Sequence, residues 1–587
     1  MRKSLLRGLA VLLALSFVAA ACGSDKPNDT SGGTTTTDAQ ASGLPDTYPD
    51  FTTPTKGGVL QMTMNDNIDC YSGLSYYGVS WSLFYFMARG LYGYPNTIES
   101  PATDTIQPDL AADLPEVSSD GLTYTVTLRE GLTFPDGSPV TSADVKATYE
   151  YMLDPNIQCS TGGPPSSGYY SVIDGVGAYS DALDADATAT AEISGITAVD
   201  PLTTEFKLSK PDGAFVRALA MGWSFIVPAS TKHEVLDTPP PFVGPYKISN
   251  YTADQSVTIE REPTWADNVA AGVPEEADEN NIDGIELKIG VPDDIQLAQL
   301  KDSKVDITFD GSAPSGSDVP AVGNDPQYEG RFFSVPDAAV DYGIFRTDKA
   351  PFDNVKLRQA VNYAVDRANV AKIIGGELKR SPWSEILSAN LLVGSSDDKG
   401  EVYTKDVDKA KALVEESGVA TPIKVTIAHF ADAPAPDVAA AIKENLDAVG
   451  FDVSLTGLTS DVYYGFLADQ ASDYDLAVAG WGQDYSDAIT FFGPLLTCPD
   501  GEPTGSNYGR FCDTEFDSEV QSISEMPDGP ERAKAFADLS VSAMKDKAPW
   551  WPLTNRRKIS FVSERLGNYI WAPGKQFYFA KYFLKDA

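Results

Sequence analysis

Two kinds of hydrophobic pattern alternate along the chain from Gly57 onward. Short runs in which apolar and polar residues alternate predict strands, and longer runs with apolar residues at three- and four-residue spacing predict helices. Strands are expected at 124–129, 204–208, 257–260 and 285–289, and helices at 142–153, 357–374, 407–416 and 438–449. We find no internal repeat, and this mixture favours α/β lobes over a sandwich or a helical bundle.

Local signals support several of these boundaries. Asp136-Gly137 predicts a turn, and Thr141 with Asp144 just beyond it has the spacing of a capping box at the start of the 142–153 helix. Gly450 is a suitable residue to end the 438–449 helix. These residues are expected to belong to the scaffold.

The N-terminus has the pattern of an exported protein. A basic start, Met1-Arg2-Lys3, precedes an apolar run at 9–20 and small residues, which predicts a secretory signal that is too short to span a membrane. Its end, Ala19-Ala20-Ala21-Cys22-Gly23, resembles a bacterial lipobox, so the chain is expected to be cut before Cys22 and acylated there. The alternative is an ordinary signal with a cysteine at its end by chance. Residues 23–55 have the composition of a flexible tether.

Composition and charge then restrict the class of protein. The 587 residues carry a formal charge of −40, which excludes a general binder of nucleic acid or anionic membranes. A hydrophobic content of 42% excludes disorder of the whole chain, and the length implies at least two lobes.

Histidine and cysteine are scarce. The two histidines, His233 and His429, lie far apart and no C-x-x-C pair is present, so a metal cofactor is not expected. Besides Cys22, four cysteines form an even set, which in an oxidising compartment favours two disulfides. Cys498 and Cys512 flank a Gly- and Pro-containing loop and are expected to bond, which leaves Cys70 to pair with Cys159.

Several long blocks occur in an order that resembles the family 5 extracellular solute-binding proteins, the peptide-binding receptors of ABC importers. The blocks are Gln107–Ala111, Asp120–Gly137, Val140–Val145, Gly244–Ile248, Pro351–Arg367, Gly480–Asp487, Leu495–Cys498, Asn507–Tyr508 and Phe511–Asp513. In relatives of the dipeptide and oligopeptide type the cysteines corresponding to Cys498 and Cys512 bond. The resemblance extends from Gly57 to the C-terminus.

The resemblance implies a periplasmic-binding-protein-like fold of type II, peptide-binding subgroup. It has two α/β lobes joined by a hinge and an extra domain, and it closes on a ligand between the lobes. The expected division is a signal peptide (1–21), a lipidated cysteine and tether (22–56), lobe I (57–99, 229–334 and 549–587), the extra domain (100–228) and lobe II (335–548).

The resemblance also suggests ligand-binding residues. In peptide-binding relatives the acid of a Trp-x-x-Asp segment pairs with the ligand's ammonium, and the residue at that place is Asp484. Trp481 and Tyr485 flank it, and their rings are expected to cover a ligand side chain, with core packing as the competing interpretation. The alternative for Asp484 is a helix cap or a turn acid, and Asp487 is expected to be structural.

Two departures from the family pattern affect the ligand. The segment 429–441, where dipeptide-binding members hold the ligand's carboxylate with an arginine, contains none. Arg346, in place of the family's asparagine before Pro351, is a candidate replacement clamp, with a surface ion pair as the alternative. His429 is a further candidate ligand contact. A longer peptide, a ligand without a carboxylate, an oligosaccharide, an opine or a metal chelate also fits.

An enzyme is the rival class and is not expected. A secreted hydrolase would need paired carboxylates or a serine with a histidine, yet the chain has neither a G-x-S-x-G elbow nor a complete H-E-x-x-H motif. An extracellular scaffold or adhesin is a third class. The sequence therefore predicts a monomeric, lipid-anchored receptor on the extracytoplasmic face of a bacterial membrane. It would need no cofactor, bind no nucleic acid, and deliver a small solute, first of all a peptide, to the permease subunits of an ABC importer.

Overall fold

The computed structural model describes most of the chain after the expected tether. The described residues are 48–65, 68, 83–97, 105–157, 167–309, 314–316, 318–391, 402–498, 506–572, 576–577 and 579–587. Cys22, Cys70 and Cys159, and with them the expected lipid anchor and second disulfide, lie outside these residues. No helix within the described residues is both long and apolar enough to cross a membrane.

A mixed five-stranded sheet has the order β11-β1-β10-β9-β8. Its strands are β1 (Val59–Thr63), β8 (Tyr246–Thr252), β9 (Ser256–Arg261), β10 (Gly284–Lys288) and β11 (Ile307–Thr308). β1 pairs in parallel with β10 and β11, and β9 runs antiparallel to β10. Helices α6 (Trp265–Ala270), α7 (Asp293–Lys301) and α8 (Asp318–Gly323) belong to the same part of the chain.

An antiparallel four-stranded sheet has the order β4-β5-β7-β6. Its strands are β4 (Glu116–Val117), β5 (Thr123–Thr127), β6 (Ile196–Asp200) and β7 (Thr203–Lys207). The helices of this part are α2 (Ser142–Met152), α3 (Ser167–Tyr170), α4 (Val176–Ala185) and α5 (Phe215–Ala218). The expected capping box is present, because the Asp144 carboxylate accepts hydrogen bonds from the Thr141 N–H and hydroxyl at 2.7 and 2.8 Å.

A six-stranded sheet has the order β13-β17-β12-β16-β14-β15. Its strands are β12 (Phe332–Phe345), β13 (Arg380–Pro382), β14 (Ile423–Phe430), β15 (Phe451–Leu458), β16 (Leu476–Gly482) and β17 (Trp550–Phe561). Its helices are α9 (Val355–Ala364), α10 (Arg367–Ile374), α11 (Val407–Glu416), α12 (Ala435–Asp447), α13 (Ser460–Ala468), α14 (Ile489–Leu496), α15 (Thr514–Ser524) and α16 (Pro530–Asp546). Successive residues of β16 contribute to different apolar clusters, one including α12 and the other α14 and α16.

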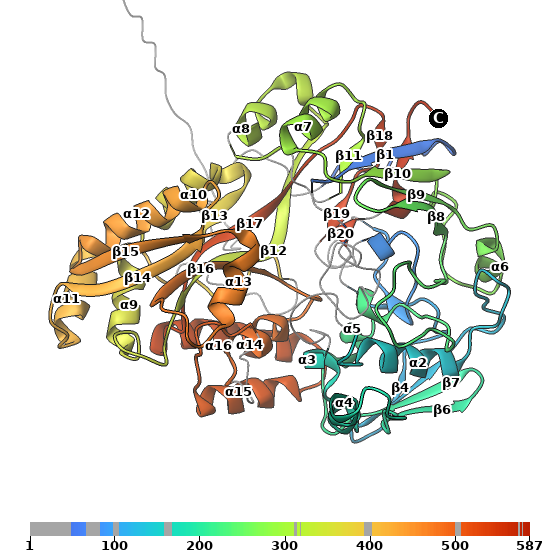
Figure 1. Cartoon of the computed structure of the whole chain (residues 1–587), viewed down its shortest axis with the longest axis horizontal. Coiled ribbons are helices and arrows are strands. Elements are labelled where there is room, and N and C mark those ends of the chain that lie inside the picture. Colours follow the sequence, from blue (N-terminus) through green and yellow to red (C-terminus); the bar gives the residue numbers. More distant parts are fainter. Residues whose placement is uncertain are drawn as a thin grey trace, which may run out of the picture. The chain divides into compact units, whose positions relative to one another are not determined.

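Two long strands connect the six-stranded sheet with the part of the chain that holds the five-stranded sheet (Figure 1). β12 and β17 pair antiparallel over nearly their whole length, from Ile344 opposite Trp550 to Phe332 opposite Phe561. Phe561 packs with Leu297 and Leu300 of α7. β17 thus belongs to the six-stranded sheet along its length, and its end contacts the part of the chain that holds the five-stranded sheet. The sequence-based division, with residues 549–587 in lobe I, stays a prediction.

Most predicted elements are confirmed. The four predicted strands are β5, β7, β9 and β10, and the helix at 407–416 is found without change as α11. The helix expected at 357–374 is wrong as a single element, because it is divided into α9 and α10. Val365 is extended, and the Asp366 side chain accepts a hydrogen bond from the Asn369 N–H, which starts a new helix. The continuous apolar spacing concealed this N-cap.

The contact between β12 and β17 predicts a severe effect at Gly343. A Cβ there would lie 1.8 Å from Cε2 of Trp551, a fully buried ring whose Nε1 donates to the Ile344 carbonyl at 3.0 Å. Gly343→Ala should lower the free energy of unfolding by about 1–3 kcal/mol, measured by urea denaturation. Gly465→Ala is the control, since its Cβ would meet nothing within 4 Å on α13. Equal stability of the two variants would contradict this packing.

Candidate functional site

The loop that joins β16 to α14 carries the predicted ligand-binding acid. β16 ends at Gly482, and the Gln483 N–H then donates to the Ala338 carbonyl of β12 at 3.0 Å. Asp484 follows at once and is partly buried. The end of one strand thus directs this loop away from the six-stranded sheet.

Tyr169 and Tyr485 connect this loop to the part of the chain that holds the four-stranded sheet. The Tyr169 hydroxyl, on α3, donates to the Asp484 carboxylate. Tyr485 is 4% exposed and packs in the same apolar core as the four-stranded sheet, with its ring edge-on to Tyr169 at 5.2 Å. Asp484 therefore lies where two parts of the fold, distant in sequence, come together.

Trp481 has a different environment from Tyr485. Its Nε1 donates to the Thr490 carbonyl at 2.9 Å, and its ring packs against the core that includes α14. The two aromatic residues beside Asp484 thus have packing roles on opposite sides of the loop. Their expected contact with a ligand side chain stays a prediction.

A buried ion pair holds the other end of the loop. The Asp487 and Arg532 side chains are both fully buried, and the guanidinium of Arg532 on α16 donates through both Nη atoms to the Asp487 carboxylate. The same carboxylate accepts the Ile489 N–H at 2.9 Å at the start of α14. Asp487 has the structural role expected from the sequence.

A second contact between the same two parts lies beside this ion pair. The Gly213 N–H donates to the Ser524 carbonyl at 2.9 Å, and Arg217 pairs with Asp528 at 2.9 Å. A Cβ at Gly213 would lie 2.1 Å from the Met526 carbonyl oxygen, so only glycine allows this approach. The contacts at Tyr169 and Gly213 are those that a separation of the two parts would break.

Gln483 is a functional candidate that the sequence reasoning missed. Both polar atoms of its side-chain amide are buried, and neither has a hydrogen-bond partner within the described residues. A buried amide without partners is costly. Its place next to Asp484 makes it a suitable partner for a peptide group of a ligand, and its only sequence signal was membership of the Gly480–Asp487 block.

Arg346 does not fit the role of an anion clamp. Its Nε and Nη2 donate to the two oxygens of Asp348 at 2.8 and 2.9 Å, its Nη1 donates to the Ser472 carbonyl at 3.2 Å, and its side chain is 6% exposed. The strand register separates it from Trp481 by about six residues, or about 20 Å along the sheet. These contacts favour the ion pair that the sequence left as the alternative, although the pair is buried and not at the surface.

His429 lies one position from the end of β14 and is 7% exposed. Its Nδ1 is 2.8 Å from the Phe430 carbonyl oxygen. Since Ala428 pairs in parallel with Ala477, His429 lies toward the end of the sheet at which β16 stops. A contact between His429 and ligand stays a prediction.

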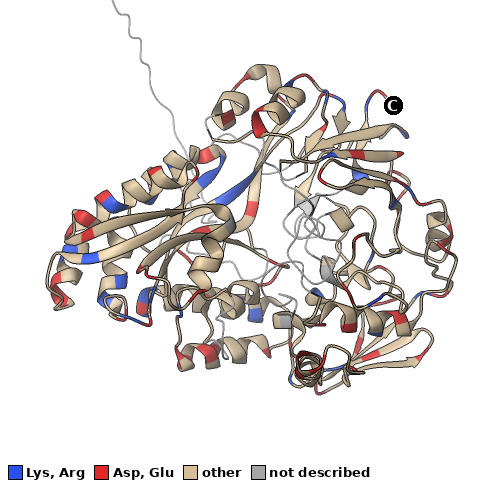
Figure 2. Cartoon of the chain, viewed as in Figure 1, with Lys and Arg blue, Asp and Glu red and all other residues tan. Residues whose placement is uncertain are grey.

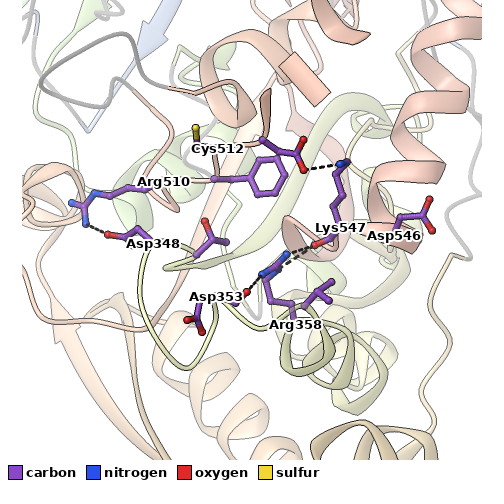
Figure 3. A pocket seen from close by; sticks show the side chains of 11 residues that line it. Asp348, Asp353, Arg358, Arg510, Cys512, Asp546 and Lys547 are labelled. Carbon is purple, nitrogen blue, oxygen red and sulfur yellow. Dashed lines mark hydrogen bonds and ion pairs between the residues drawn. The ribbon is translucent and has the colours of Figure 1, made fainter. Parts of the chain in front are cut away.

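The expected bond between Cys498 and Cys512 is present, and it lies beside a cavity of about 540 Å³ (Figure 3). Two basic side chains that line this cavity, Arg358 and Lys547, are already engaged. Arg358 donates to the Phe352, Lys547 and Ala548 carbonyls, and Lys547 pairs with Asp513 at 2.6 Å. The cavity also includes Asp348, so it lies at the opposite end of β16 from Asp484. We assign it no ligand.

Comparison with known proteins identifies the family. Residues 105–503, more than half of the chain, match the model of the bacterial extracellular solute-binding proteins, family 5. The chain belongs to this family. The fold is thus α/β and periplasmic-binding-protein-like, with two lobes and an extra domain. Proteins of this family bind solutes and are not enzymes.

Relatives with assigned names cover most of the chain. Heme-binding protein A of Haemophilus influenzae is 27% identical over 80% of this chain and 82% of its own length. Di/tripeptide-binding protein 2 of Pseudomonas aeruginosa is 25% identical over 81% of this chain and 86% of its own length. The dipeptide-binding protein of Escherichia coli is 25% identical over 78% of this chain and 82% of its own length.

Solved structures share the fold. Clavulanic acid biosynthesis oligopeptide binding protein 2 has a TM-score of 0.79 at 23% identity, covering 91% of this chain and 97% of its own. OppA of Haemophilus influenzae, in complex with the peptide RPPGFSPFR, has a TM-score of 0.67 at 20% identity. The match covers 90% of this chain and 100% of OppA.

Burial of Asp212 beside the Gly213 contact predicts a pH dependence. Burial raises the pKa of Asp212 to about 6, although the Ala214 N–H and Arg532 partly oppose it. A raised carboxyl pKa means that folding takes up a proton, so this stability is present at about pH 4 and is lost as pH rises through about 6. Asp212→Asn should remove the loss of stability between about pH 4 and pH 7, and it should be more stable than the unmutated protein at pH 7.

Thermal unfolding midpoints at pH 4, 5, 6 and 7 measure this effect. Asp181→Asn, an exposed change on α4, is the control for net charge. A difference between Asp212→Asn and the unmutated protein that stays constant over this pH range would show that the Asp212 carboxyl does not titrate as described.

Proposed function

We propose that the chain is the substrate-binding lipoprotein of an ABC importer, which captures a peptide between its two lobes and delivers it to a membrane permease. The observation that carries the proposal is Asp484, placed on a loop that two contacts fix. One is the buried Asp487–Arg532 pair, and the other is Tyr485 in the core beside the four-stranded sheet. Several relatives with related sequences are named as binders of short peptides.

The chemistry of a peptide suits this arrangement. Its ammonium group needs an anion in a partly buried place, where a charge-assisted hydrogen bond is stronger than in water. Asp484 supplies that anion, and the Tyr169 hydroxyl already donates to it. The unpartnered Gln483 amide, with one donor group and one acceptor, matches the acceptor and donor of a peptide unit.

Ligand capture follows from the contacts between the two parts of the fold. Tyr169 with Asp484, Gly213 with Ser524, and Arg217 with Asp528 hold the parts together. These contacts are polar, so water can replace them, and an open state would differ from this one by only a few kcal/mol. A ligand that contacts both parts would favour the closed state, which then docks on the permease.

Receptors for other solutes are the alternative within the same family. One relative is named as a heme-binding protein, and one structural neighbour is a binding protein in complex with agropinic acid. The alternative of a secreted hydrolase has less support, because His233 pairs with Asp154 at 3.0 Å and His429 contacts a backbone carbonyl. Within the described residues, no group of His, Cys, Asp and Glu is arranged to hold a metal ion. We propose no catalytic activity and no cofactor.

The proposed location follows from the N-terminal sequence. An acyl chain on Cys22 would anchor a monomeric protein to the extracytoplasmic face of the membrane, with residues 23–56 as the tether. The net charge gives no attraction to anionic lipids, so the anchor alone would hold the protein there. Oxidising conditions at that location would also favour the Cys498–Cys512 bond and the predicted Cys70–Cys159 bond.

Loss of the Asp484 charge should weaken peptide binding selectively. A mixture of tripeptides with free termini should bind the unmutated protein more tightly than the same mixture N-acetylated. Asp484→Asn should lose about 2–5 kcal/mol for the free-amine mixture, because an ammonium would be left without an anion. Titration calorimetry measures the affinity of each protein for each mixture. Asp452→Asn, an exposed change on β15, is the control. Equal affinity of the unmutated protein for the two mixtures would exclude this role.

Anchoring through Cys22 is tested by fractionation. In a bacterial host, the full chain should be found with the membranes, whereas Cys22→Ser should be released without loss of ligand binding. Ser24→Ala, which leaves the cysteine intact, is the control. If Cys22→Ser stays with the membranes to the same extent, another feature of the chain anchors it.

A further inference from the structure

Basic side chains gather around Asp341 in the six-stranded sheet. Figure 2 shows Lys and Arg on the adjoining strands β13 and β17, in a chain whose formal charge is −40. Arg380 on β13 pairs with Arg556 on β17 in the strand register, and both guanidinium groups donate to the Asp341 carboxylate of β12. Lys379 precedes Arg380. This group of Lys379, Arg380, Arg556 and Asp341 is called the β17 cluster below.

The β17 cluster has more positive than negative charge. Asp341 is already saturated, because it accepts Arg556 at 2.6 Å and the Thr554 hydroxyl at 2.6 Å in addition to Arg380. Burial acts to raise the pKa of Asp341, but Arg556 and Arg380 hold it well below its ordinary range. Arg380, Arg556 and Thr554 therefore occupy the Asp341 carboxylate, which leaves no hydrogen-bond acceptor on it for Lys379.

Lys379 shows that the β17 cluster has an excess of positive charge. No hydrogen bond or ion pair of its ammonium group occurs within the described part of the chain. Burial, and then the charges of Arg380 and Arg556, lower its pKa. Asp337 lies near the same cations, and burial raises the pKa of its carboxyl. Lys379, Arg380 and Arg556 still outnumber the two carboxylates of Asp337 and Asp341. An anion from outside the chain would supply the missing negative charge.

The β17 cluster lies close to the loop that carries Asp484. A Cβ at Gly480 would be 1.6 Å from Nη2 of Arg556, so the guanidinium occupies the space above Gly480 on β16. Gly480 is four residues before Asp484, which limits the distance between their Cα atoms to about 14 Å. This is about the reach of a peptide of up to four residues. The Arg556 side chain is 32% exposed, so the protein does not enclose it fully.

We propose that Arg556, with Lys379 and Arg380 beside it, binds a carboxylate of the captured peptide. The proposal rests on the proposed function and adds a second subsite to Asp484, which would bind the opposite charge. A guanidinium that is already held in place by Asp341 loses little side-chain freedom when a carboxylate binds its open side. The chain would thus select anionic or zwitterionic peptides over neutral and cationic ones.

The test uses three mixtures of tri- to pentapeptides that share the same neutral side chains. One has free C-terminal carboxylates, one is C-terminally amidated, and one is amidated but contains a single Glu or Asp. Binding is measured by titration calorimetry. The unmutated protein should bind the free-acid mixture at least tenfold more tightly than the neutral amidated one. Tight binding of the third mixture would identify a side chain as the source of the carboxylate.

Variants then assign the effect to the β17 cluster. Arg556→Gln should bind the free-acid and neutral amidated mixtures alike. Lys379→Gln breaks no hydrogen bond or ion pair within the described residues. It should reduce the difference in affinity between the free-acid and the neutral amidated mixtures without unfolding the protein. Lys372→Gln, exposed on α10, is the control for charge.

Two outcomes would overturn the proposal. One is equal affinity of the unmutated protein for all three mixtures. The other is a preference for carboxylates that stays unchanged in both Arg556→Gln and Lys379→Gln. Failure of every mixture to bind would reject the peptide ligand itself and this subsite with it.

Discussion

The buried ion pair between Asp487 and Arg532 fixes the part of the molecule on which the functional argument depends. Both side chains are fully excluded from solvent, so neither charge has water to replace its partner. Asp487 also accepts the Ile489 N–H at the first residue of α14, so the pair fixes the point where the loop after β16 meets this helix.

The loop before Asp487 has an aromatic side chain packed on each of its two sides. Tyr485 enters the core beside the four-stranded sheet, and Trp481 packs on the core beside α14. Between them remain Asp484 and Gln483, an acid and an unpartnered amide. On β16 itself, the absence of a side chain at Gly480 leaves room for Arg556. A single strand and the loop after it thus bring together the groups that a zwitterionic peptide requires.

The sequence predicted the elements better than the site. Alternating strands such as β5 and β9 and the capping box at Thr141 depend on local spacing, and the structure has them as expected. The break at Val365 was missed, because an N-cap aspartate interrupted a continuous apolar pattern without a glycine or proline. For Arg346 the sequence left two alternatives open, a ligand clamp and an ion pair. Its partner Asp348 is only two residues away, but nothing in the pattern indicates that the two side chains turn toward each other.

Other features of the site depend on strand register and cannot be seen in the sequence. Arg556 reaches Gly480 only because β12 lies between β16 and β17 and aligns Asp341 with both Gly480 and Thr554. The position of Gln483 likewise depends on β12, because its backbone N–H donates to the Ala338 carbonyl. The most direct test of the account is native mass spectrometry of the protein lacking residues 1–22, before and after mild unfolding and refolding. We predict that the untreated protein releases a set of short peptides, and release of a single non-peptide solute would contradict the central claim.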